Sequence, residues 1–308
     1  MVGTSWLVAL LAVAAIGFAN QRGGTCTVAA MSEIVTEGRF GQMAAMMEAS
    51  IWVAGGLLLL SVLGHSPSVS PGYAASSATI AGGVLFGIGA FLNRACSLGT
   101  IARIGSGDWA YLATLAGFYL GAWSTHDLPA PGQLTQASLL LGTPVWLAIF
   151  VLALLAARVF THGWRIRRGG RVALRHVWSP HLATTVIGIA FLVALVTAGS
   201  WSYTSFLGDL ARGSWHDLKL KLALNLALLS GAIIGGWTAN RLGFVLPDRK
   251  RIARCLAGGT IMGAGATLIP GGNTRLILMG MPLLHAYAWL AFASMCITLY
   301  ALIRLTRA

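Results

Sequence analysis

Mostly apolar stretches, each close to the length of a bilayer-crossing helix, recur along the whole chain. A helix needs about 20 predominantly apolar residues to cross, because lipid offers its backbone no hydrogen-bond partner. Seven stretches suit full spans: 6–19, 50–64, 109–123, 138–157, 182–200, 221–237 and 279–302. With 56% hydrophobic and 9% charged residues, the 308-residue chain also has too little polar surface for a water-soluble protein. We therefore predict an all-α polytopic membrane protein.

The positions of the charges predict which connections face the cytoplasm. The formal net charge is +13, and two connections are densely basic. The first holds Arg158, Arg165, Arg167, Arg168, Arg171 and Arg175, and the second holds Arg241, Arg249, Lys250, Arg251 and Arg254. Positive residues favour the cytoplasmic side, so we expect both connections there. Connections 65–77 and 124–137 lack Lys and Arg and are expected to face outward. Residues 1–5 also lack Lys and Arg, which favours a retained first helix over a cleaved signal peptide.

Two further apolar stretches, 80–92 and 256–269, are short and rich in glycine. They match each other at a constant offset of 176 residues (258 − 82 = 176). In the shared frame, Gly82, Gly83, Gly87 and Gly89 correspond to Gly258, Gly259, Gly263 and Gly265. We therefore predict an internal duplication, with a first membrane repeat at 1–157, a basic cytoplasmic connection at 158–180 and a second membrane repeat at 181–308.

The length of the two glycine-rich stretches predicts how they lie in the membrane. At about 1.5 Å per residue neither crosses comfortably, so we expect broken or re-entrant helices. Interrupted helices at corresponding positions of two halves mark the binding site in many transporters. We predict two inverted pseudo-symmetric halves whose short helices meet at the midplane. The alternative is a packing motif alone, because Gly83 and Gly87 are four apart and let neighbouring helices approach closely.

The residues just after each glycine frame are the best candidates for contact with a substrate. Cys96 and Ser97 follow the first frame, and Gly272 and Asn273 occupy the equivalent positions after the second. A broken helix frees backbone N–H groups, which hold an anion without a full charge nearby. A thiol adds a weak, soft donor, and the combination favours a small sulfur-containing anion. Cys26 follows two glycines, which fits either a helix break near a cavity or an interfacial loop thiol.

Charged residues near these motifs have two interpretations. Arg94, Arg103 and Arg275 lie beside the repeats, where they would attract an anion or extend to lipid headgroups. Three acids between the first two apolar runs are expected at the interface: Glu33, Glu37 and Glu48. No chain of Asp, Glu and His residues typical of proton pumps stands out. The seven His residues lack metal-ligand spacing, so we predict no metal site, and no cofactor is predicted. No nucleotide-binding loop is present, so we do not expect ATP-driven transport by this chain alone. The basic residues flank apolar runs, so we predict no nucleic-acid partner.

Several motifs in order resemble a known family. The pattern R-x-x-x-C-x-x-A-A at 22–30 resembles a segment near the start of the YeeE/YedE family of sulfur-compound transporters. Residues 81–83, 87–89, 95–99 and 103–107 resemble its first repeat, and 258–259, 263–265 and 271–273 resemble its second. The likeness covers most of the chain, although each motif is short and dominated by glycine.

The resemblance implies a thiosulfate uptake protein of the cell inner membrane, not an enzyme, with two pseudo-twofold halves around a constricted pathway. It also implies a small soluble sulfur-carrier protein on the cytoplasmic side. Cys26 and Cys96 match two family cysteines that pass the anion along through S–H hydrogen bonds. The third cysteine of the family is replaced, because its G-C-N motif reads G-G-N at 271–273. This departure leaves sulfite, sulfate or a selenium oxyanion as alternative cargo.

Two other functions stay open at this point. A membrane thiol oxidoreductase would use Cys26 and Cys96 as a redox pair, although the chain has no C-x-x-C motif. A non-transporting membrane partner would only hold the sulfur-carrier protein. The remaining thiols, Cys255 and Cys296, are predicted to have no role and a packing role, respectively.

Overall fold

The computed structural model describes a helical protein. The described residues are 2–65, 69, 72–128, 131–134, 138, 140, 142, 144–167 and 177–307. Arg168, Arg171 and Arg175 of the predicted basic connection lie outside them, as do the side chains of Arg165 and Arg167. Among the described residues the structure contains no β-strand, only two isolated β-bridges.

The helices form two series joined by one long helix. The first series is α1 (Val2–Gly23), α2 (Thr27–Glu37), α3 (Gly41–Val62), α4 (Ser77–Asn93), α5 (Ser97–Gly105), the 3-10 helix η1 (Trp109–Tyr111) and α6 (Leu112–Ser124). Helix α7 (Val145–Arg167) follows. The second series is α8 (Pro180–Ala198), α9 (Tyr203–Ala211), α10 (Leu218–Thr238), α11 (Arg249–Leu268), α12 (Gly272–Arg275), the π-helix η2 (Leu276–Gly280) and α13 (Ala286–Leu305).

The lengths and composition of these helices confirm a polytopic membrane protein. Within the described residues, seven helical stretches are long and apolar enough to cross a membrane, or up to eight with one bent pair. That pair is α11 and the segment Gly272–Gly280, which meet at 44°. Helices α4 and α5 form a second interrupted stretch, Ser77–Gly105. The predicted broken helices are therefore present after both glycine frames.

Some predicted boundaries are wrong. The final span was placed at 279–302, but Met279 belongs to η2 and α13 begins at Ala286. Pro282 lies in the interruption, where it cannot donate a backbone hydrogen bond and disfavours a helical residue before it. Helix α11 is also longer than the apolar stretch 256–269, because it begins at Arg249 in the basic segment.

The order of elements repeats along the chain. Helices α1, α2, α3, α4, α5 and α6 have counterparts in α8, α9, α10, α11, α12 and α13. Thr27 begins α2 and Tyr203 begins α9, again 176 residues apart (203 − 27 = 176). Within the described residues, helix α7 has no counterpart. This order supports the division into repeats at 1–157 and 181–308, which stays a prediction.

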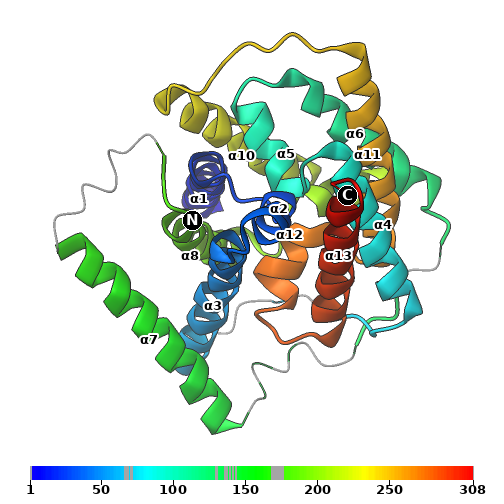
Figure 1. Ribbon diagram of the computed structural model, residues 1–308. Helices are drawn as coiled ribbons and strands as arrows, with labels where there is room; N and C mark the ends of the chain where they lie inside the picture. The colour runs from blue at the N-terminus through cyan, green and yellow to red at the C-terminus, as the bar shows by residue number, and fades with distance from the viewer. Residues whose placement is uncertain are drawn as a thin grey trace.

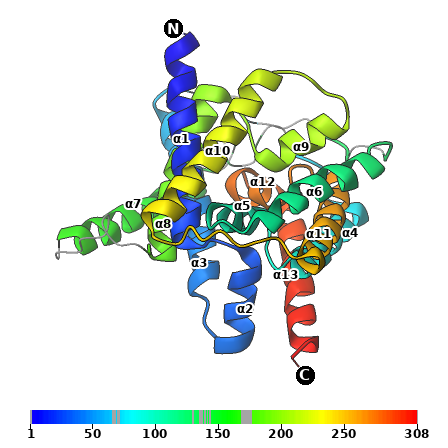
Figure 2. The ribbon, with the colours of Figure 1, turned by 90° about the horizontal axis from the view of Figure 1, so that it is seen from above.

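The packing of the long helices follows the same correspondence between the two series. Helix α1 packs on α10 as its counterpart α8 packs on α3, and α6 packs on α11 as α13 packs on α4. The counterparts α1 and α8, and likewise α4 and α11, pack directly on each other. Two groups of long helices result, α1, α3, α8 and α10 on one side of Figure 1 and α4, α6, α11 and α13 on the other. The short helices α2, α5 and α12 lie between them (Figures 1 and 2).

Glycines make the contact between α4 and α11 possible. A Cβ atom on Gly89 would lie 2.7 Å from the carbonyl oxygen of Gly258, and one on Gly265 would lie 2.8 Å from that of Gly82. Neither distance is compatible with a real side chain. Because Gly82 meets Gly265 while Gly89 meets Gly258, the two helices run antiparallel. Two glycines of each frame, the first and the last, therefore pack on the other frame of the same chain.

The remaining frame glycines pack on the outer neighbours. A Cβ on Gly83 would lie 2.5 Å from the carbonyl oxygen of Ala291 in α13, and one on Gly263 would overlap that of Phe118 in α6. The close helix packing predicted for these glycines is confirmed.

We expect Gly263→Val to destabilise the protein, because its side chain would overlap the backbone of α6. Overpacking of this kind costs about 1–3 kcal/mol, which corresponds to a fall of roughly 5 °C in the melting temperature. Thermal unfolding of the purified protein in detergent measures the effect. The matched control is Gly163→Val in α7, where no neighbouring atom lies within 4 Å of the position that a Cβ would take. Equal melting temperatures for both variants would contradict this account of the packing.

Candidate functional site

The beginnings of short helices gather at the middle of the fold. Helices α2, α5, α9 and α12 each follow a break in the chain. Every break contains a residue with positive φ: Gly24, Arg94, Gly199 and Gly271. The first N–H groups of a helix have no partner inside it, so each break supplies free backbone donors. Hydrogen bonds between these breaks join the four helices into one site.

Two cysteines cap two of the short helices. Cys26 is the N-cap of α2 and Cys96 is the N-cap of α5. The backbone N–H of Cys96 donates to Sγ of Cys26 at 3.4 Å, and the N–H of Thr27 donates to Sγ of Cys96 at 3.3 Å. Both thiols are buried, with exposed fractions of 8% and 0%. Each sulfur therefore takes the position at a helix N-terminus that an anion would occupy.

A set of buried polar side chains extends from the thiols. Ser97 in α5 donates to Oδ1 of Asn273 in α12, and its hydroxyl lies 2.9 Å from that of Thr274. The Asn273 amide donates to Oγ1 of Thr27 at 3.1 Å. All of these residues are buried. The structure thus brings together four predicted site residues, Cys26, Cys96, Ser97 and Asn273.

Helix α9 adds two residues that were not predicted. The hydroxyl of Tyr203 donates to the carbonyl of Ser97 at 2.6 Å, and Thr204 donates to the carbonyl of Gly271 at the same distance. The sequence near α9 has neither a cysteine nor the glycine frame. The offset of 176 residues was the available signal, because it pairs Tyr203 with Thr27.

Gly272 differs from its counterpart in its backbone as well as its side chain. Its φ is +61°, a left-handed conformation that favours glycine, whereas φ of Cys96 is −76°. A Cβ at this position would also lie 3.0 Å from Cε2 of Phe86. The third thiol is therefore absent from a position that accommodates a side chain poorly. Gly99, in contrast, leaves room for a thiol that is present, because a Cβ at this position would lie 2.6 Å from Sγ of Cys26.

A cavity borders the thiol side of this polar cluster. Its volume is about 220 Å³, and its walls include Cys26 and Gly99. Three arginines also line it, namely Arg94, Arg103 and Arg241. Two of the three predicted anion-attracting arginines therefore share one cationic cavity next to the thiols.

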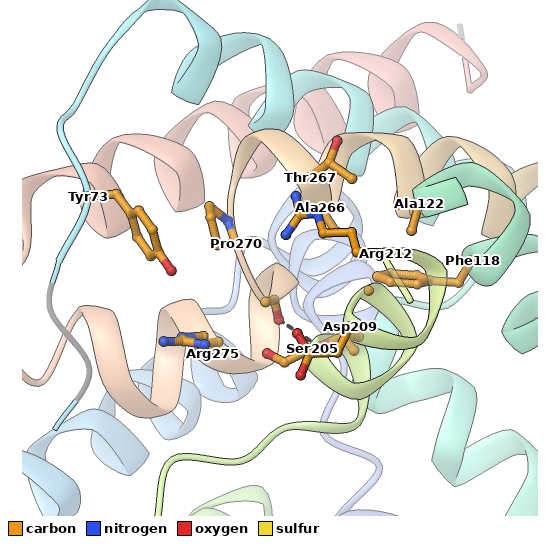
Figure 3. A pocket seen from close by; sticks show the side chains of 14 residues that line it. Tyr73, Phe118, Ala122, Ser205, Asp209, Arg212, Ala266, Thr267, Pro270 and Arg275 are labelled. Atoms are coloured by element: carbon orange, nitrogen blue, oxygen red, sulfur yellow. Dashed lines mark hydrogen bonds between the residues drawn. The ribbon is translucent and has the colours of Figure 1, made fainter. Parts of the chain in front are cut away.

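A second cavity borders the cluster at Gly271 and Thr204. Its volume is about 80 Å³, and Arg212 and Arg275 contribute positive charge. Figure 3 shows Arg275 and Tyr73 among the residues that line this cavity. One acid, Asp209, also lines it, but this carboxylate is paired with Lys221 at 2.7 Å.

The two cavities are related by the repeat. Ala29, Arg94, Ala95 and Gly99 line the first cavity, and their counterparts Ser205, Pro270, Gly271 and Arg275 line the second. The buried polar cluster lies between cavities built from equivalent parts of the two halves.

Three other residues lie outside the hydrogen bonds of this cluster. Cys255 is fully buried against Ala95, Ile104 and Tyr111, and Cys296 packs against the main core. The prediction that Glu48 lies at the interface is wrong, because its side chain is fully buried. The reason is that α3 begins at Gly41, so Glu48 lies two turns inside the helix.

We expect Asn273→Leu to lower stability, because the substitution leaves the buried hydroxyls of Ser97 and Thr27 without their amide partner. An unsatisfied buried polar group costs about 1–3 kcal/mol. Asn225→Leu is the matched control, since in the described part of the chain the Asn225 amide bonds only the carbonyl of Lys221 one turn away. Thermal unfolding measures both, and an equal loss in the two variants would contradict the proposed network.

Comparison with known proteins assigns the family. A family profile described as "Sulphur transport" matches residues 22–301. A comparison with curated proteins found no match. The matched segment runs from the last turn of α1 into α13 and includes the thiols, the polar cluster and both cavities. This multi-pass membrane protein therefore belongs to the YeeE/YedE family of sulphur transport proteins.

Proposed function

We propose that this chain transports a small sulfur-containing anion, with thiosulfate as the first candidate, across the cell inner membrane. The proposal rests on one observation above all. The Cys26 and Cys96 sulfurs each accept a backbone N–H at the start of a helix, inside a buried cluster between two arginine-lined cavities. The anion would pass from one cavity to the other through Cys26, Cys96, Ser97 and Asn273.

The chemistry of the cluster suits brief binding of an anion. An anion that enters replaces the thiol sulfurs as acceptor at the starts of α2 and α5, where the helix dipole favours negative charge. The displaced thiols and the hydroxyl of Ser97 then donate to the anion. An S–H group is a weak donor, so the anion is held without a full charge and leaves readily. At Gly272 no thiol is present, and the backbone N–H there already donates to the carbonyl of Ile269 at 3.0 Å, so Asn273 is the donor on this side of the cluster.

The orientation of the halves is part of the proposal. Helices α4 and α11 run antiparallel, and the end of α1 at Gly23 meets the start of α8 at Ala183. Counterpart helices of opposite direction support two inverted halves. The cavity with Arg241 lies next to the second basic connection and would open to the cytoplasm. A small sulfur-carrier protein would receive the anion there. The cavity with Tyr73 would open outward.

The first prediction for this function concerns selectivity. In proteoliposomes that contain only this protein, we expect thiosulfate uptake to exceed sulfate uptake roughly ten-fold, as one well-placed group discriminates between ligands. The terminal sulfur of thiosulfate is soft and polarisable like the thiols, whereas sulfate offers only oxygen. Sulfite and selenium oxyanions complete the panel. Faster uptake of another anion would change the assigned cargo, and no uptake of any anion would favour a membrane partner that only holds the sulfur carrier.

The second prediction concerns the thiols. Cys96→Ala removes the sulfur that accepts the N–H of Thr27 at the start of α2, and we expect thiosulfate uptake to fall roughly ten-fold or more at equal protein in the vesicles. Cys255→Ala is the matched control, because Cys255 is equally buried but lies in a separate cluster with Ala95. Equal uptake by both variants would contradict a thiol-lined pathway. Dependence of uptake on an added oxidant would instead support a redox role for the contact between Cys26 and Cys96.

A further inference from the structure

A second group of ionisable residues lies outside the thiol cluster. Glu48 on α3 is fully buried. Its Oε1 lies 2.8 Å from Nε2 of His162 on α7, and its Oε2 lies 2.6 Å from Nδ1 of His181 on α8. Both carboxylate oxygens therefore face an imidazole. An ionisable residue inside a membrane is costly and is usually retained for function, with a partner.

The other groups around Glu48 are one arginine and two neutral donors. Nη1 of Arg158 on α7 lies 3.8 Å from Oε2. The hydroxyl of Thr185 lies 3.2 Å from Nε2 of His162, and the indole of Trp52 donates to Oε1 at 3.4 Å. The charged and titratable groups that the described structure places against Glu48 are thus Arg158, His162 and His181.

This chemistry favours a proton over a metal ion. Among the described residues, no group of three or more His, Cys, Asp or Glu side chains has the geometry of a metal site. Imidazole gains and loses a proton near neutral pH, and its charge depends on a neighbouring carboxylate. The side chains of His162 and His181 are 18% and 28% exposed, whereas that of Glu48 is 0% exposed. The imidazoles are therefore the more accessible members of this group.

Helices α3 and α8, which carry Glu48 and His181, also contact segments next to the thiol cluster. On α3, the hydroxyl of Ser50 donates to the carbonyl of Ile277 at 2.6 Å. Ile277 lies in the π-helix η2, which directly follows α12 and Asn273. Such π-helical turns are frequent at functional sites. On α8, Ala183 packs so closely on Gly23 that a Cβ added to this glycine would overlap that of Ala183. Gly23 precedes Cys26 by only three residues.

We propose that Glu48, His162 and His181 bind the proton that accompanies the anion, so that uptake is proton-coupled. This inference rests on the proposed transport function. An anion that enters a cell with a negative interior moves against the membrane potential, and a cation that moves with it offsets that work. The proton crosses with the anion and leaves to the cytoplasm from this cluster, which lies near the basic connection, and no covalent bond of the anion changes. A change of charge at Glu48 acts on α12 through Ser50 and on Cys26 through α8.

The test measures proton movement and anion movement in the same proteoliposomes. The vesicles enclose a pH-sensitive dye, and labelled thiosulfate is added outside. For the wild-type protein, we expect the lumen to acidify as the anion enters, and an inward proton gradient to accelerate uptake. Glu48→Gln keeps the size of the side chain but cannot ionise, so we expect gradient-driven uptake to fall at least about ten-fold. Exchange of labelled for unlabelled thiosulfate at equal pH should fall far less.

Two further variants make the result decisive. Glu37→Gln is the matched control, because Glu37 is exposed and pairs only with Arg39 in the described structure. His162→Gln repeats the test if Glu48→Gln is poorly folded. Anion uptake by the wild type without acidification would overturn the proton coupling alone. If Glu48→Gln and His162→Gln each lose exchange as strongly as gradient-driven uptake, the cluster has a structural role and the proton coupling is also overturned. A wild type that neither takes up nor exchanges any anion would overturn the transport function itself.

Discussion

Direct backbone contact between α4 and α11 is the constraint on which the rest of the fold depends. Side chains at Gly89 and Gly265 would overlap the opposite helix, so only glycine permits this separation. Lipid supplies no hydrophobic force between helices, and close approach supplies the van der Waals attraction instead. Each helix ends at a break, and because the pair is antiparallel the two breaks lie at its opposite ends; the short helices α5 and α12 that follow them meet in the polar cluster. The hydrogen bond between Ser97 and Asn273 forms at that point.

The site keeps polar groups in the membrane by pairing them with one another. Backbone donors at the helix starts are satisfied by thiol sulfurs, and the hydroxyl of Ser97 is satisfied by Asn273 and Thr274. These partners are weak or neutral, so an incoming anion can replace them without breaking a strong ion pair. The full charges stand apart, in arginines that line the two cavities. This separation suits attraction of an anion followed by loose binding, which transport of sulfur compounds requires.

The local sequence was sufficient for much of the fold and for part of the site. Long apolar runs predict helices because lipid leaves the backbone no other partner, and a repeated glycine frame is visible at a fixed offset. That offset also points to Cys96, Ser97 and Asn273 from the sequence alone. The ends of the final span were less predictable. An apolar run does not show where Pro282 interrupts it, and α13 therefore begins later than its hydropathy suggests.

What the sequence by itself determined is the helical membrane class, the duplication and the family to which the motifs point. Only the tertiary structure decided which distant residues touch. Cys26 and Cys96 are 70 positions apart, and Glu48 is separated from His162 by 114 and from His181 by 133. In the sequence, Glu48 resembles an acid at the membrane interface. No motif near His162 or His181 indicates that either histidine contacts it. Their meeting depends on how α3, α7 and α8 pack, and helix packing is set by the fit of whole surfaces, which no short motif encodes.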